Sequence, residues 1–121
     1  MTMELPLSQY YESHNYDLSR ISPIYAREIF VNAVKEYFEK KISESLLASI
    51  AGDLMYQHKM TDKIIENDVN LGHILTFVSE LDWFKANQKV SYDSTLKELK
   101  KFFELNEKYQ SPSSGTKLLP E

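Results

Sequence analysis

The sequence has no cysteine, which excludes disulfide bonds, thiolate metal sites and thiol nucleophiles. Its three glycines, Gly52, Gly72 and Gly115, lie too far apart to build a loop that cradles phosphate. Apolar runs stay well short of the roughly 18 residues that a membrane-spanning helix requires, and the first residues lack the pattern of a signal peptide. We therefore expect a cytoplasmic protein with no membrane partner.

A basic face is also missing, and this bears on nucleic-acid binding. The sequence has 18 acidic and 14 basic residues, a net charge of −4, and residues 61–82 alone carry that excess of acid. Lysines pair at Lys40–Lys41 and at Lys100–Lys101, but glutamates surround both pairs, as on an ordinary solvated helix. Because sequence-independent binding to nucleic acid depends on a basic face, we expect no nucleic-acid partner.

Histidines are few and show no ligand spacing. His14, His58 and His73 form no HExxH or other compact metal-binding pattern. Ligand residue types without ligand spacing are weak support for a metal site, so we predict no metal and no cofactor. One alternative stays open, a small helical enzyme or metal-binding protein that uses His58, His73 and nearby acids.

The most apolar stretch is residues 46–58, and the rest of the fold is expected to form around it. Ala48, Gly52 and Tyr56 form one face of this helix, small enough at its centre for another helix to approach closely. A second, broader face carries large apolar side chains at helical spacing, and a helix this apolar is covered by neighbours on more than one side. The broad face consists of Leu46, Leu47, Ile50, Ala51, Leu54 and Met55.

Capping residues and apolar periodicity predict the other long helices. Ser22–Pro23 begins a helix over about residues 23–41, because serine accepts from first-turn amides and proline suits the first helical position. Ser43 caps the central helix in the same way. Asn70 begins a third helix that reaches Phe84.

The remaining segments are predicted to be connections and chain ends. A polar segment over residues 85–92 leads to the last helix. Residues 1–21 are rich in tyrosine and are expected to form an irregular arm with a single helical turn from Ser8 to Glu12. Its tyrosine rings pack while their hydroxyls stay in water. We predict an all-α fold, a compact bundle of four principal helices. It forms a single helical domain over residues 1–110, followed by a flexible tail over residues 111–121.

Partner-binding residues are predicted in and just after the acidic segment. Glu80 and Asp82 lie two apart in the run SELDWF; such residues do not face each other on a helix, so the pair is not arranged for shared proton chemistry. Phe77 and Trp83 fall off the inner stripe of the third helix. Trp83 is then either a core residue or apolar surface beside the acids. Charge speeds association with a basic protein and an aromatic ring supplies affinity. The predicted protein-binding residues are Asp68, Phe77, Glu80, Asp82 and Trp83.

The predicted function is a non-catalytic protein-binding module, not an enzyme, with its oligomeric state left open. In size, charge and number of helices, residues 22–109 resemble the immunity proteins and antitoxins that neutralise basic bacterial nuclease toxins, although no motif carries the resemblance. The resemblance implies an inhibitor that acts through an acidic and aromatic helical surface. A helical DNA-associated regulator is a further alternative. Its recognition helix would be residues 94–109, where lysines alternate with glutamates.

Overall fold

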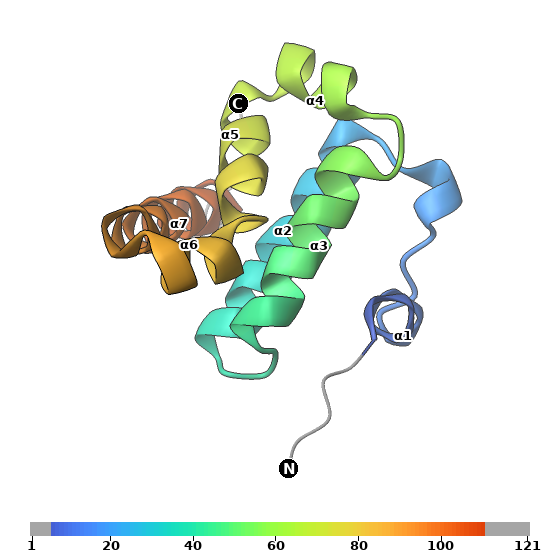
Figure 1. Cartoon of the computed structure of the whole chain (residues 1–121). Helices are drawn as coiled ribbons and strands as arrows, with labels where there is room; N and C mark the ends of the chain where they lie inside the picture. The colour runs from blue at the N-terminus through green and yellow to red at the C-terminus, as the bar shows by residue number, and fades with distance from the viewer. Residues whose placement is uncertain (1–5, 111–121) are drawn as a thin grey trace.

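The computed structural model describes residues 6–110, and the predicted tail, residues 111–121, lies outside them. Over the described residues the chain is all-α, as predicted, and contains no strand (Figure 1). The four principal helices of the prediction are wrong in number, because helices also form in the N-terminal arm and between the second and third predicted helices, and the third predicted helix is divided. The elements are α1 (Leu7–Ser13), the 3₁₀-helix η1 (Leu18–Arg20), α2 (Pro23–Phe38), α3 (Glu44–Tyr56), α4 (Thr61–Asn67), α5 (Val69–Val78), α6 (Leu81–Asn87) and α7 (Lys89–Gln110).

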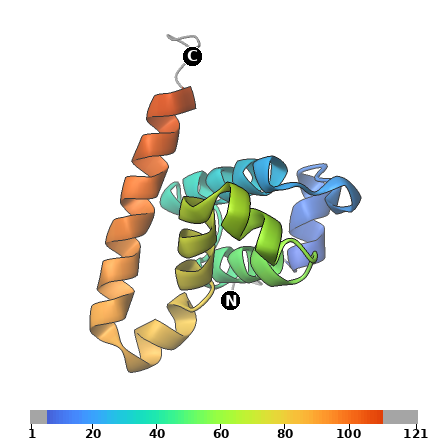
Figure 2. The same ribbon diagram turned by 90° about the horizontal axis from the view of Figure 1, so that it is seen from above.

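Both serine caps are confirmed. The Ser22 hydroxyl accepts from the backbone N–H of Tyr25 at 3.1 Å, and the Ser43 hydroxyl accepts from that of Leu46 at 3.0 Å. The two caps start α2 and α3 at the predicted residues. The short connection makes α2 and α3 antiparallel neighbours (Figures 1 and 2).

The central position of α3 is confirmed. It packs against α1, α2, α4, α5 and α6, and every residue of its predicted broad face is buried. The predicted neighbour at Gly52 is the end of α5: a Cβ atom added there would lie 3.6 Å from the Cβ of Ser79. That is an ordinary contact distance, so alanine would also fit and the close approach does not require glycine.

The predicted third helix is divided into α5 and α6, and it starts earlier than predicted. The Asp68 side chain, not Asn70, caps α5 by accepting from the N–H of Leu71 at 3.3 Å. At the other end the Ser79 hydroxyl donates to the carbonyl of Thr76, and the Glu80 N–H turns back to the carbonyl of Phe77. These tighter bonds end α5 and let α6 start in a new direction with Leu81 buried.

The predicted connection over residues 85–92 is wrong, because α6 continues to Asn87 and α7 begins at Lys89. The segment contains neither glycine nor proline, so nothing in it prevents helix formation.

α7, with 22 residues, is the longest of the described helices. It runs along one side of the others, and its C-terminal end extends past them (Figure 2). None of the described helices combines the length and the apolar character needed to cross a bilayer.

Candidate functional site

Trp83 and Phe77 are both half-exposed, with 51% and 50% of their surface accessible. Trp83 lies on α6 and packs edge-on against Phe84, with ring centroids 6.1 Å apart. Phe77 lines a groove of about 450 Å³ between α5 and α7, beside Ile74 and Leu105. Trp83 does not line this groove. Phe77 therefore exposes its ring in the groove between α5 and α7, and Trp83 exposes its ring on α6 outside that groove.

Glu80 and Asp82 are exposed and lie just before Trp83 in the chain. Asp82 accepts from the Ser45 hydroxyl at 3.0 and 3.2 Å, which places it at the start of α3. Among the described side chains, no lysine, arginine or histidine lies within ion-pair distance of either carboxylate. The charge of this pair is therefore uncompensated within the described part of the protein.

Asp68 has a different setting, because its carboxylate is bound inside the fold. Arg27 donates to it twice, from Nε at 2.7 Å and from Nη2 at 2.8 Å, while Nη1 reaches the Oδ1 of Asn106 at 2.6 Å. The guanidinium also lies 5.1 Å from the centre of the Phe102 ring. Hydrogen bonding from Arg27 lowers the pKa of Asp68 from its ordinary value. Asp68 thus joins α2, α5 and α7.

The acidic segment is spread over the fold rather than gathered on one surface. Asp62 and Glu66 lie on α4, whose first residue, Thr61, donates to the carbonyl of Met55 near the end of α3. Asp82 lies instead at the beginning of α3, beside Ser45. A helix of 13 residues is about 20 Å long, and this length separates the two groups. Only Glu80 and Asp82 remain close to Trp83 in the chain.

His58 and His73, the residues of the enzyme alternative, line different depressions. His58 Nε2 lies 2.7 Å from Asp53 Oδ2, and the Tyr11 hydroxyl donates to the same oxygen at 2.7 Å. A carboxylate can orient an imidazole for general-base chemistry, but here it also holds α1 in place. Within residues 6–110, no group of three or more potential ligands is arranged to hold a metal ion.

The sequence did not reveal this Asp53–His58 contact. The two residues are five apart, and His58 lies beyond the C-cap of α3, so helical spacing does not pair them. A second histidine–carboxylate contact joins His14 to Glu36 at 2.7 Å. The His14–Glu36 contact depends on the position of α1, because His14 is the C-cap of that helix.

The described part of the N-terminal arm contains α1 and η1, which is more helix than the single turn predicted, and its tyrosine hydroxyls bond to protein groups, which corrects the prediction that they stay in water. Tyr10 is fully buried and donates to Glu36 at 2.9 Å, Tyr11 donates to Asp53, and the Tyr16 hydroxyl accepts from Asn32. Burial, and then the hydrogen bonds to the carboxylates, raise the pKa of both Tyr10 and Tyr11 well above the usual range. Polar contacts therefore attach α1 to α2 and α3.

We expect this attachment to fail in alkali. A tyrosine whose pKa is raised by folding contributes stability below its unfolded pKa, about 10, and loses that contribution as the pH rises through the folded value. The melting temperature should therefore fall as the pH passes about 10, together with the appearance of tyrosinate absorbance. Tyr10→Phe/Tyr11→Phe should show a smaller fall. An identical pH profile for the parent and the double variant would contradict the prediction.

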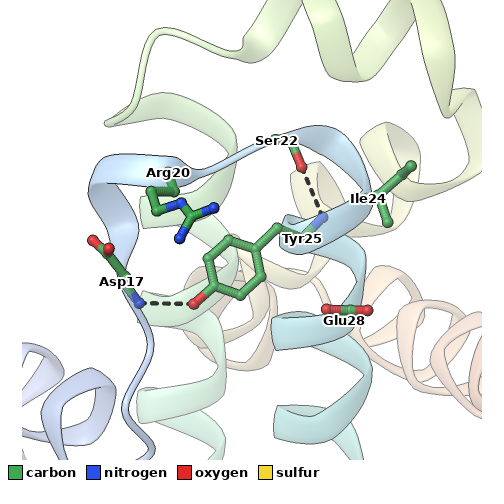
Figure 3. A pocket seen from close by; sticks show the side chains of 6 residues that line it. All are labelled: Asp17, Arg20, Ser22, Ile24, Tyr25 and Glu28. Atoms are coloured by element: carbon green, nitrogen blue, oxygen red, sulfur yellow. Dashed lines mark hydrogen bonds between the residues drawn. The ribbon is translucent and has the colours of Figure 1, made fainter.

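A pocket of about 330 Å³ lies where the arm joins α2 (Figure 3). Figure 3 shows Tyr25 reaching from α2 to Asp17, whose backbone N–H donates to the Tyr25 hydroxyl at 2.7 Å. Ile24 points away from Asp17. The polar contacts of this pocket hold the start of η1, so it belongs to the attachment of the arm.

The fold and these surfaces define an all-α protein in which several helices surround α3 and two aromatic side chains remain half-exposed. Comparisons of the chain with protein-family models, with curated proteins and with solved structures found no match.

Proposed function

We propose that the protein is a non-catalytic binding module for a basic protein, in the manner of an immunity protein or antitoxin. The acidic–aromatic surface, defined as Glu80, Asp82 and Trp83, makes the contact. This surface is smaller than the predicted one, because Asp68 is held by Arg27 and Phe77 lies in the groove between α5 and α7.

The observation that supports the proposal is a half-exposed tryptophan that follows two exposed carboxylates, neither of which has a cation of the described residues within ion-pair distance. Covering the exposed part of such a ring removes on the order of 100 Å² of apolar surface from water, worth about 2–3 kcal/mol. Uncompensated carboxylates beside the ring attract a basic partner over several ångströms and accelerate its association. The ring and the carboxylates therefore serve affinity and association rate separately.

Photo-crosslinking followed by binding kinetics tests the proposal. A photoreactive residue at position 83, with position 57 on the exposed end of α3 as control, identifies the protein bound in the producing cell. For that protein, Glu80→Gln/Asp82→Asn should slow association and flatten its dependence on salt. Asp62→Asn/Glu66→Gln removes the same charge from α4. It should change the association rate and its dependence on salt much less.

Trp83→Ala should accelerate dissociation and weaken binding by about 2 kcal/mol, roughly thirtyfold. Because the ring is half-exposed, its removal should lower the melting temperature only slightly. The proposal is wrong if position 83 captures no protein that position 57 does not also capture. It is equally wrong if the α4 variant slows association as much as the α6 variant.

A further inference from the structure

The end of α2 and the middle of α7 enclose a shallow depression that the acidic–aromatic surface does not include. Its volume is about 470 Å³. The residues around it come from two segments about sixty positions apart in the chain, and each segment supplies lysine. The lining residues are Tyr37, Phe38, Lys40, Leu96, Lys97 and Lys100.

The three lysines of this depression, Lys40, Lys97 and Lys100, are exposed and uncompensated. Among the described side chains, no carboxylate lies within ion-pair distance of any of them. Two carboxylates that neighbour them in the chain bind other lysines: Glu39 binds Lys41 at 3.1 Å and Glu98 binds Lys101 at 3.7 Å. A concentration of positive charge therefore surrounds the depression in a protein whose net charge is negative.

The floor of the depression is apolar. Phe38 is 40% exposed and meets Phe103 edge-on, with ring centroids 5.4 Å apart. Leu96 is half-buried and packs against the core. The Tyr37 hydroxyl donates to Glu44 and is not available to a ligand. A ligand would therefore meet a phenylalanine ring and a leucine within a ring of ammonium groups.

Lys40 occupies a backbone conformation that favours glycine. Its φ is 63°, and the N–H groups of Lys40 and Lys41 bond back to the carbonyls of Tyr37 and Glu36. This is the Schellman arrangement, in which the left-handed position is usually glycine, since a side chain there costs roughly 1–2 kcal/mol. Asn15 and Lys59 also have a positive φ. At position 40 the turn places a lysine beside the depression, at a cost that glycine would not have.

We propose that this lysine-rimmed depression binds an acidic protein segment, with an apolar side chain of that segment on Phe38 and Leu96 and its carboxylates on the three lysines. The charge and the apolar floor are complementary to such a segment. Nucleic acid fits less well, because Glu98 and Glu104 interrupt the basic residues along the exposed side of α7. The proposal is independent of the acidic–aromatic surface.

A synthetic probe tests the proposal on the full chain. The probe is a fluorescein-labelled peptide that alternates glutamate and aspartate with phenylalanine and leucine, compared with the same peptide carrying glutamine and asparagine. We expect the parent to bind the acidic peptide at least about tenfold more tightly at low salt. Lys97→Gln/Lys100→Gln should weaken this binding about tenfold, and the matched control Lys63→Gln/Lys85→Gln should change it less than about twofold.

Lys40→Gly separates binding from stability. It should weaken peptide binding about threefold while leaving the melting temperature unchanged or higher, because glycine relieves the left-handed conformation. Phe38→Ser should weaken binding without changing its salt dependence. Trp83→Ala should leave peptide affinity unchanged, which distinguishes failure here from failure of the proposed function.

Four results would overturn the proposal. The first is equal binding of the acidic and the neutral peptide by the parent, and the second is a loss with the control lysine pair as large as that with Lys97 and Lys100. An oligothymidylate that binds more tightly than the peptide, and is lost with Lys97→Gln/Lys100→Gln, would assign the depression to nucleic acid. Self-association in sedimentation velocity that the same variant abolishes would assign it to a second copy of the chain.

Discussion

Replacing Leu54 with aspartate is expected to abolish cooperative unfolding. Leu54 is fully buried on α3, the helix that packs against most of the others. A carboxylate placed there would have no partner, and burying an unpaired charge costs more than about 4 kcal/mol. That is comparable with the total stability of many small domains, about 5–15 kcal/mol. Thermal melts followed by circular dichroism should show a broad or absent transition.

Two controls make this result specific to the buried site. Leu54→Met nearly conserves volume and should cost less than about 1.5 kcal/mol. Ser49→Asp places the same charge on an exposed position of the same helix and should change stability by about 0.5 kcal/mol or less. A cooperative melt of Leu54→Asp near the parent temperature would show that α3 is not central.

Replacing Asp68 with alanine is expected to remove about 2–4 kcal/mol of stability. The change deletes the cap of α5, worth about 1 kcal/mol, and leaves the guanidinium of Arg27 without its carboxylate in a partly buried position. Asp68→Asn can still cap the helix and should lose less. Denaturant unfolding of the three proteins measures the differences. Equal stability of Asp68→Ala and the parent would contradict the role of Asp68 in joining α2, α5 and α7.

Lowering the pH should remove part of the stability that Asp68 contributes. Arg27 lowers the pKa of Asp68 in the folded protein below its unfolded value of about 4. The stabilisation is therefore fully present above the unfolded pKa and is lost as the pH falls through the lower folded pKa. The difference in stability between the parent and Asp68→Asn should shrink below about pH 4. A difference that is independent of pH would show that the ion pair contributes nothing.

The elements that the sequence predicted well have local causes. Ser22 and Ser43 start α2 and α3 because a cap bonds to an amide three residues away. The buried face of α3 follows from helical spacing within thirteen residues. Phe77 and Trp83 depart from the apolar stripe, but the sequence left open whether Trp83 is core or surface, and the structure shows it half-exposed.

Elements that the sequence did not predict depend on contacts between residues far apart in the chain or on weak local signals. The Ser79 hydroxyl donates to the carbonyl of Thr76 at the break between α5 and α6. Serine also occurs inside helices, so its presence in the sequence does not mark a break. The attachment of the arm was missed because Tyr10 and Tyr11 bond to Glu36 and Asp53, which lie 26 and 42 residues away. No spacing rule relates residues so far apart in the chain.

The sequence by itself determined the all-α class, the caps of α2 and α3 and the apolar face of α3, because each follows from interactions within a few turns of helix. Only the tertiary structure decided which charges are free. It joined Asp68 to Arg27, 41 residues away, and placed no cation of the described residues within ion-pair distance of Glu80 or Asp82. It also gathered lysines from α2 and α7, which the sequence shows as separate solvated pairs, around Phe38. Packing of helices sets these distances, and charge interactions depend on distance in space rather than along the chain.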